Sequence, residues 1–390
     1  MIPLAKPVLG EAEERAVVEV LRSGQLSLGP RLQEFERLFA AHLGASRACA
    51  VSSGTAGLHL ALRAVDVGAG DEVVTSPFSF VASANAAVYE DAKPVFADID
   101  PVTLNLDPAA AEAAITPRTK ALLPVHIFGY PADMAAFERL AERHGLAIVE
   151  DACEALGARH RDGMAVGARG NPAVFGFYAN KQLTTGEGGI VTLADPTLKA
   201  RIDSERNQGR APDMGWLDHD RLGFNYRLSD IACALGIAQL GRLDEMLAGR
   251  ARVAGWYREA LADLAPAPPL SSSSSSSGGA VEDMAEHLRL PCENSAGDVR
   301  GWFVFVVQVP RGVDRDETVR RLAKLGVQSK PYLPAIHLMS YYRERFGHRE
   351  GELPICEDVA SRSLALPFFS EMTEGQVARV AEALGQAIGS

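Results

Sequence analysis

Lys181 is the residue in this sequence whose setting points most directly to chemistry. It follows a short apolar run at 174–177, which predicts a buried strand, and it precedes threonines and a glycine cluster that ends at Gly189. A ligand can reach a lysine placed there, and removal of water favours the neutral amine that a Schiff base requires. Most lysines are solvated surface residues, so the rest of the chain must decide between the two interpretations.

Three further segments would suit an aldehyde cofactor such as pyridoxal phosphate (PLP) on that lysine. Residues 52–55, Ser-Ser-Gly-Thr, open a predicted helix and offer hydroxyls, backbone N–H groups and a helix dipole to a phosphate. Asp151 follows an apolar strand and offers a carboxylate to a pyridine nitrogen. Phe78 and Phe80 follow another strand and offer an aromatic face. Each segment alone is typical of an ordinary cap, turn or core residue, so only the set indicates chemistry.

Alternating strands and helices must position these segments. Apolar runs predict strands at 48–51, 71–75, 94–97, 121–125, 146–149, 174–177 and 190–193, and helical signals lie between most of them. This order is typical of an α/β fold with a mostly parallel sheet covered by helices on both faces. Ligands bind beyond the carboxyl ends of such strands, so residues 52–55, Asp151 and Lys181 are expected to share one site.

The C-terminal part of the chain has a different pattern. Residues 228–264 are predicted to be helical, and the Pro-, Ser- and Gly-rich run that follows predicts a flexible insertion at about 266–300. A strand at 302–309 and a helix at 314–325 come next, and Thr373 with Gln376 predicts a capping box for the last helix. We therefore expect a large domain at 1–245 and a smaller α+β domain at 246–390.

Composition excludes several classes of function. The 390-residue chain has a formal net charge of -11 and no basic stretch with interleaved aromatics, which argues against nucleic-acid binding. Its 5 cysteines are far apart and its histidines are scattered, so neither a disulfide framework nor a metal site is expected, and a reducing cytoplasm is the expected compartment. No signal-like or membrane-spanning apolar run occurs. The phosphate-loop, dinucleotide and hydrolase motifs are also absent.

The order and spacing of these segments resemble the DegT/StrS-type sugar aminotransferases, which are PLP enzymes of the aspartate-aminotransferase fold (fold type I). Seven pieces carry the resemblance and cover nearly the whole chain outside 266–300: 52–55, 70–73, 78–83, 150–152, 180–189, 225–230 and His337. The resemblance implies a large domain with a sheet of the seven-stranded type and a smaller C-terminal domain.

The resemblance also implies roles for particular residues. Lys181 would form the Schiff base and shuttle a proton, and Asp151 would pair with the pyridine nitrogen. The remaining expected contacts are Phe80 with the ring face, Gly54 and Thr55 with the phosphate, Asn225 with the phosphate of a neighbouring subunit in a homodimer, and Tyr332 and His337 with a nucleotide-linked sugar.

Two positions depart from the family's commonest pattern. Gly176 stands where many relatives have a phosphate-binding Ser, so only its backbone could help bind the cofactor. Glu154 stands where Gln or His often lies near the cofactor's phenolic oxygen, so its carboxylate would have to be protonated or share a proton there.

The function implied is transfer of an amino group from glutamate or glutamine to a nucleotide-linked keto sugar in amino-sugar or surface-polysaccharide biosynthesis. The presence of Lys181 argues against the related sugar dehydratases, which have His at this position. Two alternatives stay open, namely amination of a non-sugar ketone such as a cyclitol, and a PLP-binding protein without turnover.

Overall fold

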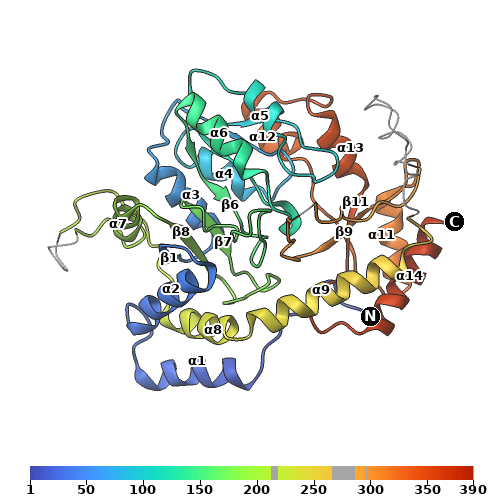
Figure 1. Cartoon of the computed structure of the whole chain (residues 1–390), viewed down its shortest axis with the longest axis horizontal. Helices are drawn as coiled ribbons and strands as arrows, with labels where there is room; N and C mark the ends of the chain where they lie inside the picture. Colours follow the sequence, from blue (N-terminus) through green and yellow to red (C-terminus); the bar gives the residue numbers. More distant parts are fainter. Residues whose placement is uncertain (212–217, 266–285, 296, 390) are drawn as a thin grey trace.

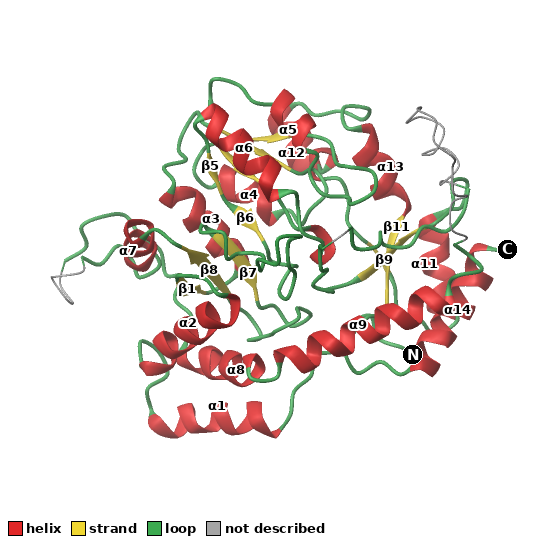
Figure 2. Cartoon of the chain, viewed as in Figure 1, coloured by secondary structure: helices red, strands yellow, loops and turns green. Residues whose placement is uncertain are grey.

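The computed structural model describes residues 1–211, 218–265, 286–295 and 297–389. It has a large body built on a central sheet and a smaller body that contains β9 and β11 (Figure 1). Both termini lie on the side of the smaller body (Figure 1). Figure 2 shows the long helix α9 (Leu243–Ala260) running from the large body to α14 (Glu374–Ile388), against which it packs.

The central sheet joins two sets of four hydrogen-bonded strands, ordered β3-β2-β4-β5 and β6-β7-β8-β1. Only Val149 separates β5 from β6, and a parallel bridge between Val125 and Asp151 continues the pairing across the break. Counting β5 and β6 as one strand, the sheet has seven strands, and only β8 runs antiparallel to its neighbours. The strands are β1 (Arg47–Val51), β2 (Glu72–Thr75), β3 (Lys93–Phe96), β4 (Thr119–Leu123), β5 (Ala147–Ile148), β6 (Glu150–Asp151), β7 (Ala173–Gly176) and β8 (Gly189–Leu193).

Helices cover this sheet, and the predicted α/β fold with a mostly parallel sheet is confirmed. The helix α3 packs on β7 and β8, while α6 packs on β4 and β5. The other bounds in the first two-thirds of the chain are α1 (Glu11–Ser23), α2 (Pro30–Leu43), α3 (Gly54–Ala64), α4 (Ala82–Val88), α5 (Pro108–Ala113), η1 (Ile127–Gly129), α6 (Met134–His144), α7 (Pro196–Glu205) and α8 (Asp230–Leu240). The helical pattern predicted at 228–264 is therefore two helices, α8 and α9, separated at Gly241 and Arg242.

The parallel strands bring the chemical segments to one edge of the sheet. Since β8 is antiparallel to both β1 and β7, those two strands run in the same direction, and β6 is parallel to β7. The segments that follow β1, β6 and β7 carry Gly54, Glu154 and Lys181. The carboxyl ends of parallel strands meet at the same edge, which is where α/β proteins bind ligands.

The smaller body is a three-stranded antiparallel sheet, ordered β10-β11-β9, with helices packed around it. The N-terminus of the chain also belongs to this smaller body. Ile2 forms a parallel bridge with Val327 and packs in the apolar core of the smaller body. The capping box of Thr373 and Gln376 on α14 is present, as predicted. The division at residue 245 stays a prediction. The remaining bounds are β9 (Phe305–Gln308), α11 (Arg315–Lys324), β10 (Lys330–Pro331), η2 (Ile336–Leu338), α12 (Ser340–Phe346), α13 (Pro354–Arg362) and β11 (Ser363–Leu366).

The predicted flexible insertion at 266–300 is wrong for its described second part. Leu288 is buried, and Arg289 exchanges two 2.9 Å backbone hydrogen bonds with Gln308 of β9. Val299 exchanges backbone hydrogen bonds of 2.8 and 2.9 Å with Arg159. Apolar residues and ladder pairing therefore fix this stretch to the fold, while residues 266–285 lie outside the described part of the chain.

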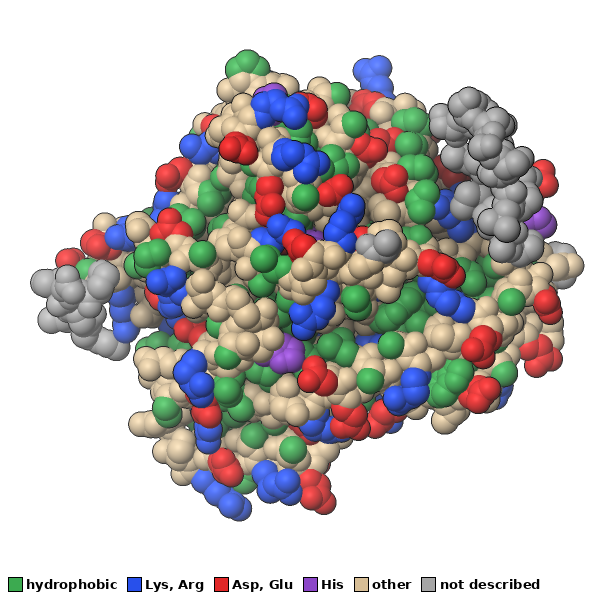
Figure 3. All heavy atoms as spheres, viewed as in Figure 1, with side chains coloured by type: hydrophobic (Ala, Val, Ile, Leu, Met, Phe, Trp, Pro, Cys, Tyr) green, Lys and Arg blue, Asp and Glu red, His purple; other side chains and the backbone are tan. Residues whose placement is uncertain are grey.

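On the face drawn in Figure 3, acidic and basic side chains are interspersed and form no large patch of one charge. Within the described ranges, no helix combines the length and apolarity needed to cross a membrane. The same ranges contain no group of three or more His, Cys, Asp or Glu side chains that could hold a metal ion.

Candidate active site

Lys181 is largely buried, as predicted, with 15% of its side chain exposed. The loop that follows β7 turns it toward the sheet edge, where its Nζ lies 3.6 Å from Glu154 Oε1. The same nitrogen lies 4.0 Å from the centre of the Phe303 ring. The amine is therefore held between a carboxylate and an aromatic face, away from bulk water, rather than extended into solvent.

Asp151 has a carboxylate with a hydrogen-bond donor on each oxygen. Ser83 Oγ donates to Oδ2 at 2.6 Å, and the backbone N–H of Cys153 donates to Oδ1 at 3.1 Å. Ser79 supports this arrangement, since its Oγ lies 2.7 Å from Ser83 Oγ. Asp151 is buried, so these donors fix the orientation of its carboxylate.

The start of α3 approaches the neighbouring strand ends so closely that only glycine fits. A Cβ on Gly54 would lie 2.8 Å from Cys153 Sγ and 3.4 Å from Gly176 Cα. Ser53 caps the helix by accepting the N–H of Ala56 at 3.0 Å. We call the start of α3, with Gly54 and Thr55, and the adjacent Cys153 and Gly176 the cradle. The free N–H groups of such a helix start suit a phosphate.

Glu154 has its two carboxylate oxygens in different surroundings. Its Oε2 accepts the backbone N–H of Phe128 at 3.0 Å, and its Oε1 faces Lys181. Burial raises the pKa of this carboxyl, although Lys181 and the Phe128 N–H oppose the shift. Tyr332 joins the cluster: its ring centre lies 5.7 Å from that of Phe128, and burial, together with the Glu154 charge, raises the pKa of its phenol. Tyr332 therefore lies beside Glu154 and Phe128, and its expected contact with a sugar stays a prediction.

Phe80 and Asn225 both lie at the surface. Phe80 is 62% exposed, and its carbonyl oxygen lies 3.2 Å from the Oγ of Ser83, the hydroxyl that donates to Asp151. Its expected role as the stacking aromatic stays a prediction. Asn225 is exposed. It lies near the start of α3, since the carbonyl of the next residue, Tyr226, accepts the Ser52 N–H at 2.8 Å.

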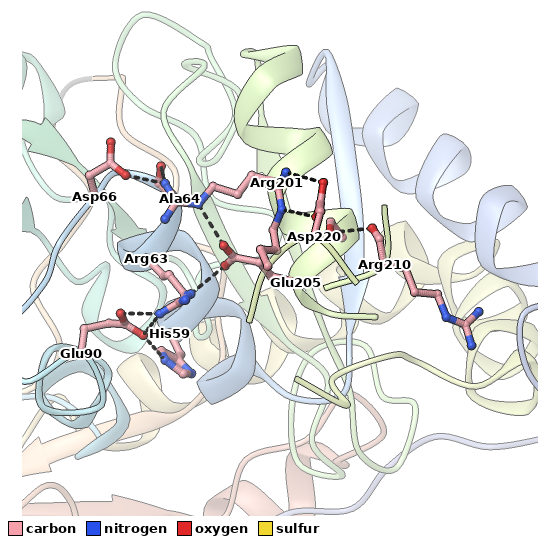
Figure 4. Close-up of polar contacts among 11 residues, drawn as sticks. His59, Arg63, Ala64, Asp66, Glu90, Arg201, Glu205, Arg210 and Asp220 are labelled. Carbon is pink, nitrogen blue, oxygen red and sulfur yellow. Dashed lines mark hydrogen bonds and ion pairs between the residues drawn. The ribbon is translucent and has the colours of Figure 1, made fainter. Parts of the chain in front are cut away.

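A largely buried ionic network centred on Arg63 is drawn in Figure 4. It contacts the segment that carries Asn225, because Arg63 lies over the Phe224 ring at 5.6 Å. Arg63 of α3 bonds Glu90 at 2.8 Å and Glu205 of α7 at 3.0 Å. His59, on the same helix, lies 2.6 Å from Glu90 and 3.3 Å from the Tyr226 hydroxyl. The backbone of the segment is tied in as well, since Phe224 N–H donates to the Glu205 carbonyl at 2.6 Å. One helix therefore begins at the cradle and also supports Asn225.

His337 has its side chain turned to another carboxylate, and its expected contact with a sugar stays a prediction. Its side chain is fully buried, and its Nε2 bonds Glu357 at 3.0 Å. The backbone explains this orientation: the Ile336 N–H bonds the Pro77 carbonyl at 2.8 Å, and the adjacent His337 ring packs beside Phe96.

Sequence reasoning missed the side chains that complete the site. Ser83 lies inside the segment that carries Phe80, but no local sequence pattern predicts that its hydroxyl donates to the buried Asp151 carboxylate. Cys153 follows Asp151 by two residues, a spacing that strand alternation places on the same side. Phe128 and Phe303 come from distant loops, so only the folded chain reveals them.

The cradle, the fixed carboxylate and the enclosed lysine together fit PLP. Gly54 and Thr55 would hold its phosphate, Asp151 its ring nitrogen and Lys181 its aldehyde carbon. The donor set supports this fit, because a helix start, a buried carboxylate held by Ser83 and an enclosed amine are the groups that a phosphate, a pyridine nitrogen and an aldehyde require.

Comparison with known proteins identifies the class. A model of the DegT/DnrJ/EryC1/StrS aminotransferase family matches residues 7–385, so the chain belongs to this family of PLP-dependent transaminases. It is 38% identical to GDP-perosamine synthase of Caulobacter vibrioides, over 99% of this chain and 98% of that protein. It is 37% identical to the spore coat polysaccharide biosynthesis protein SpsC of Bacillus subtilis (strain 168), over 98% and 96%. The structure of DesV from S. venezuelae, in complex with a ketimine intermediate, is 36% identical, has a TM-score of 0.85 and covers 96% of this chain and 93% of DesV.

Proposed function

We propose that this transaminase transfers an amino group from glutamate or glutamine to a ketone on a nucleotide-linked sugar. The observation that carries the proposal is the enclosed Lys181 amine beside Glu154, at the same sheet edge as the hydrogen-bonded Asp151. The names of the two curated relatives support the substrate class, since one makes GDP-perosamine and the other acts in polysaccharide biosynthesis.

The chain's own residues would divide the work as follows. Lys181 would hold the cofactor and move a proton at Nζ between carbon atoms. Asp151, fixed by Ser83, would keep the pyridine nitrogen protonated, while Gly54 and Thr55 bind the phosphate. PLP supplies the electron sink for the reaction. Phe80 would cover the ring, and Tyr332 would face the substrate.

A homodimer is part of the proposal, because Asn225 is exposed and would serve the neighbouring subunit rather than its own. Its segment is held by Arg63, which lies over the Phe224 ring, and by the Glu205 carbonyl, which accepts the Phe224 N–H, and these contacts would keep the exposed amide in a constant position. A brace of this kind is useful for a residue that must reach across an interface.

The experiment that tests the function is a screen of nucleotide-linked 3-keto and 4-keto sugars with glutamate or glutamine as donor. We expect an amino sugar from at least one of them, and none from a Lys181→Ala control. Turnover of a cyclitol ketone with no turnover of any nucleotide-linked sugar would overturn the sugar assignment. PLP binding without turnover of any ketone would contradict the assignment of a transaminase reaction to this site.

A further inference from the structure

Glu154 divides its two oxygens between a structural contact and a reactive one. Its Oε2 is occupied by the Phe128 N–H at 3.0 Å, which leaves Oε1 for the Lys181 amine at 3.6 Å. Both side chains are shielded, with 8% of Glu154 and 15% of Lys181 exposed. The carboxylate is therefore a built partner of the amine and not a flexible surface ion pair.

The backbone that holds Glu154 is fixed from several sides. Phe128 has the left-handed conformation, with φ 52°, which lets its N–H point at the carboxylate, and the next residue, Gly129, has no room for a Cβ beside the Gly301 carbonyl. The side-chain amide of Gln182 donates from Nε2 to two backbone carbonyls, that of Glu154 at 2.7 Å and that of Gly301 at 3.1 Å. Strained backbone held by its surroundings is common where a group must be positioned for chemistry.

The groups facing this pair raise the proton affinity of the Glu154 carboxylate. Phe303 covers Lys181, while Asp151, Cys153 and Tyr332 are the other titratable neighbours. Burial raises the pKa of Glu154, and the nearby Asp151 charge acts in the same direction. A proton transfer within this shielded pair therefore replaces two buried charges by two neutral groups, which lowers the cost of desolvation.

We infer that Glu154 is the proton acceptor of Lys181 during amino-group transfer. The N–H bond of the Lys181 ammonium breaks, an O–H bond forms at Glu154 Oε1, and the electron pair stays on Nζ. The pair has no net charge before or after the step, and Lys181 becomes the neutral amine that can take a proton from substrate carbon. This role belongs to the transaminase chemistry of the family and is independent of which ketone is aminated.

The first test measures Lys181 without any substrate. Apoprotein is methylated with formaldehyde and a mild reductant at neutral pH, and the Lys181 peptide is quantified by mass spectrometry against the exposed Lys93 and Lys330. Glu154→Gln keeps the size of the side chain and an acceptor for the Phe128 N–H, but removes the carboxylate. We expect Lys181 to be labelled severalfold faster in this variant, because a buried amine without a counter-charge is more often neutral.

The second test separates a proton acceptor from a mere counter-ion. In single turnovers with the amino donor, Glu154→Gln should slow amine transfer roughly a hundredfold, a typical loss for one acid–base group. Glu154→Asp keeps a carboxylate and should lose less. Glu187→Gln, the same change at an exposed position of the Lys181 loop, is the control and should match the wild type in both tests.

Two results would overturn the inference. Faster labelling with equal or faster amine transfer in Glu154→Gln would show that the carboxylate only stabilises the ammonium. Unchanged labelling would show that Lys181 does not exchange charge with Glu154. If the wild type accepts neither glutamate nor glutamine, the proposed donors are wrong, and the labelling result alone decides whether the two groups are coupled.

Discussion

Ser83 Oγ donates a 2.6 Å hydrogen bond to Asp151 Oδ2 and thereby fixes a buried carboxylate at the end of β6. The two residues are 68 positions apart in the chain. The serine hydroxyl is itself within 2.7 Å of Ser79 Oγ, so its single hydrogen can be directed to Asp151 while Ser79 donates to it. The carboxylate that would hold the cofactor's ring nitrogen is therefore oriented before any ligand arrives.

Ser83→Ala should weaken PLP binding roughly tenfold, because a hydrogen bond to a charged group contributes about 1.5–3 kcal/mol and part of this orients Asp151. Equilibrium dissociation of PLP, followed by absorbance, measures the effect. Ser79→Ala, one hydrogen bond further away, should cost less. An unchanged dissociation constant in Ser83→Ala would mean that Asp151 does not depend on this donor.

Gly54→Ala should destabilise the protein by about 1–3 kcal/mol and reduce PLP binding, since its Cβ would lie 2.8 Å from Cys153 Sγ. Chemical denaturation and PLP titration measure the two effects. Gly68→Ala is a suitable control, because a Cβ there meets nothing within 4 Å. Adding Cys153→Ala should recover part of the lost stability, and the close-approach explanation fails if the double variant recovers none.

A mixture of Lys181→Ala and Asn225→Ala chains should regain activity that neither chain has alone. If Asn225 serves the neighbouring subunit, each mixed dimer contains one intact site, and random mixing restores about a quarter of wild-type activity. The chains are unfolded, mixed and refolded, and turnover is measured with the best substrate of the screen. No gain above the separate variants would place Asn225 outside the partner's site.

His160 should make the protein less stable in mild acid. Burial lowers the pKa of this buried histidine from 6.5 to about 4, with His126 beside it acting in the same direction. Because the unfolded chain takes up this proton first, stability falls as the pH drops from about 6.5 to about 4, by up to roughly 3 kcal/mol. His160→Phe keeps a ring against His126 and should lose less stability over that range in chemical denaturation. An equal loss in both proteins would assign the acid sensitivity elsewhere.

Most of the fold was predictable from local patterns. Apolar runs followed by small-residue turns identified the strands that lead to Gly54, Asp151 and Lys181, because buried parallel strands leave a clear sequence pattern. The interruption between α8 and α9 was missed, since Gly241 alone is a weak break signal. The pairing of Arg289 and Val299 with the fold was missed because a neighbouring low-complexity run dominated the interpretation of that region.

Individual residues of the site could be predicted from the sequence, but the contacts between them could not. Lys181 and Asp151 follow strands, so topology alone brings them to one edge of the sheet. The pairing of Glu154 with both Lys181 and Phe128 depends on how three separate loops meet, and the burial of His337 depends on a backbone hydrogen bond to Pro77 nearby. Such tertiary relationships have no local pattern in the sequence.

The central claim, that Lys181 is the amine to which PLP is attached, has one direct test. The protein loaded with PLP is reduced with borohydride, digested and mapped by mass spectrometry. We predict a phosphopyridoxyl group on the peptide that contains Lys181, and none on Lys181→Arg protein treated in the same way. A stable label on another lysine of the wild-type protein, with Lys181 unmodified, would contradict the assignment.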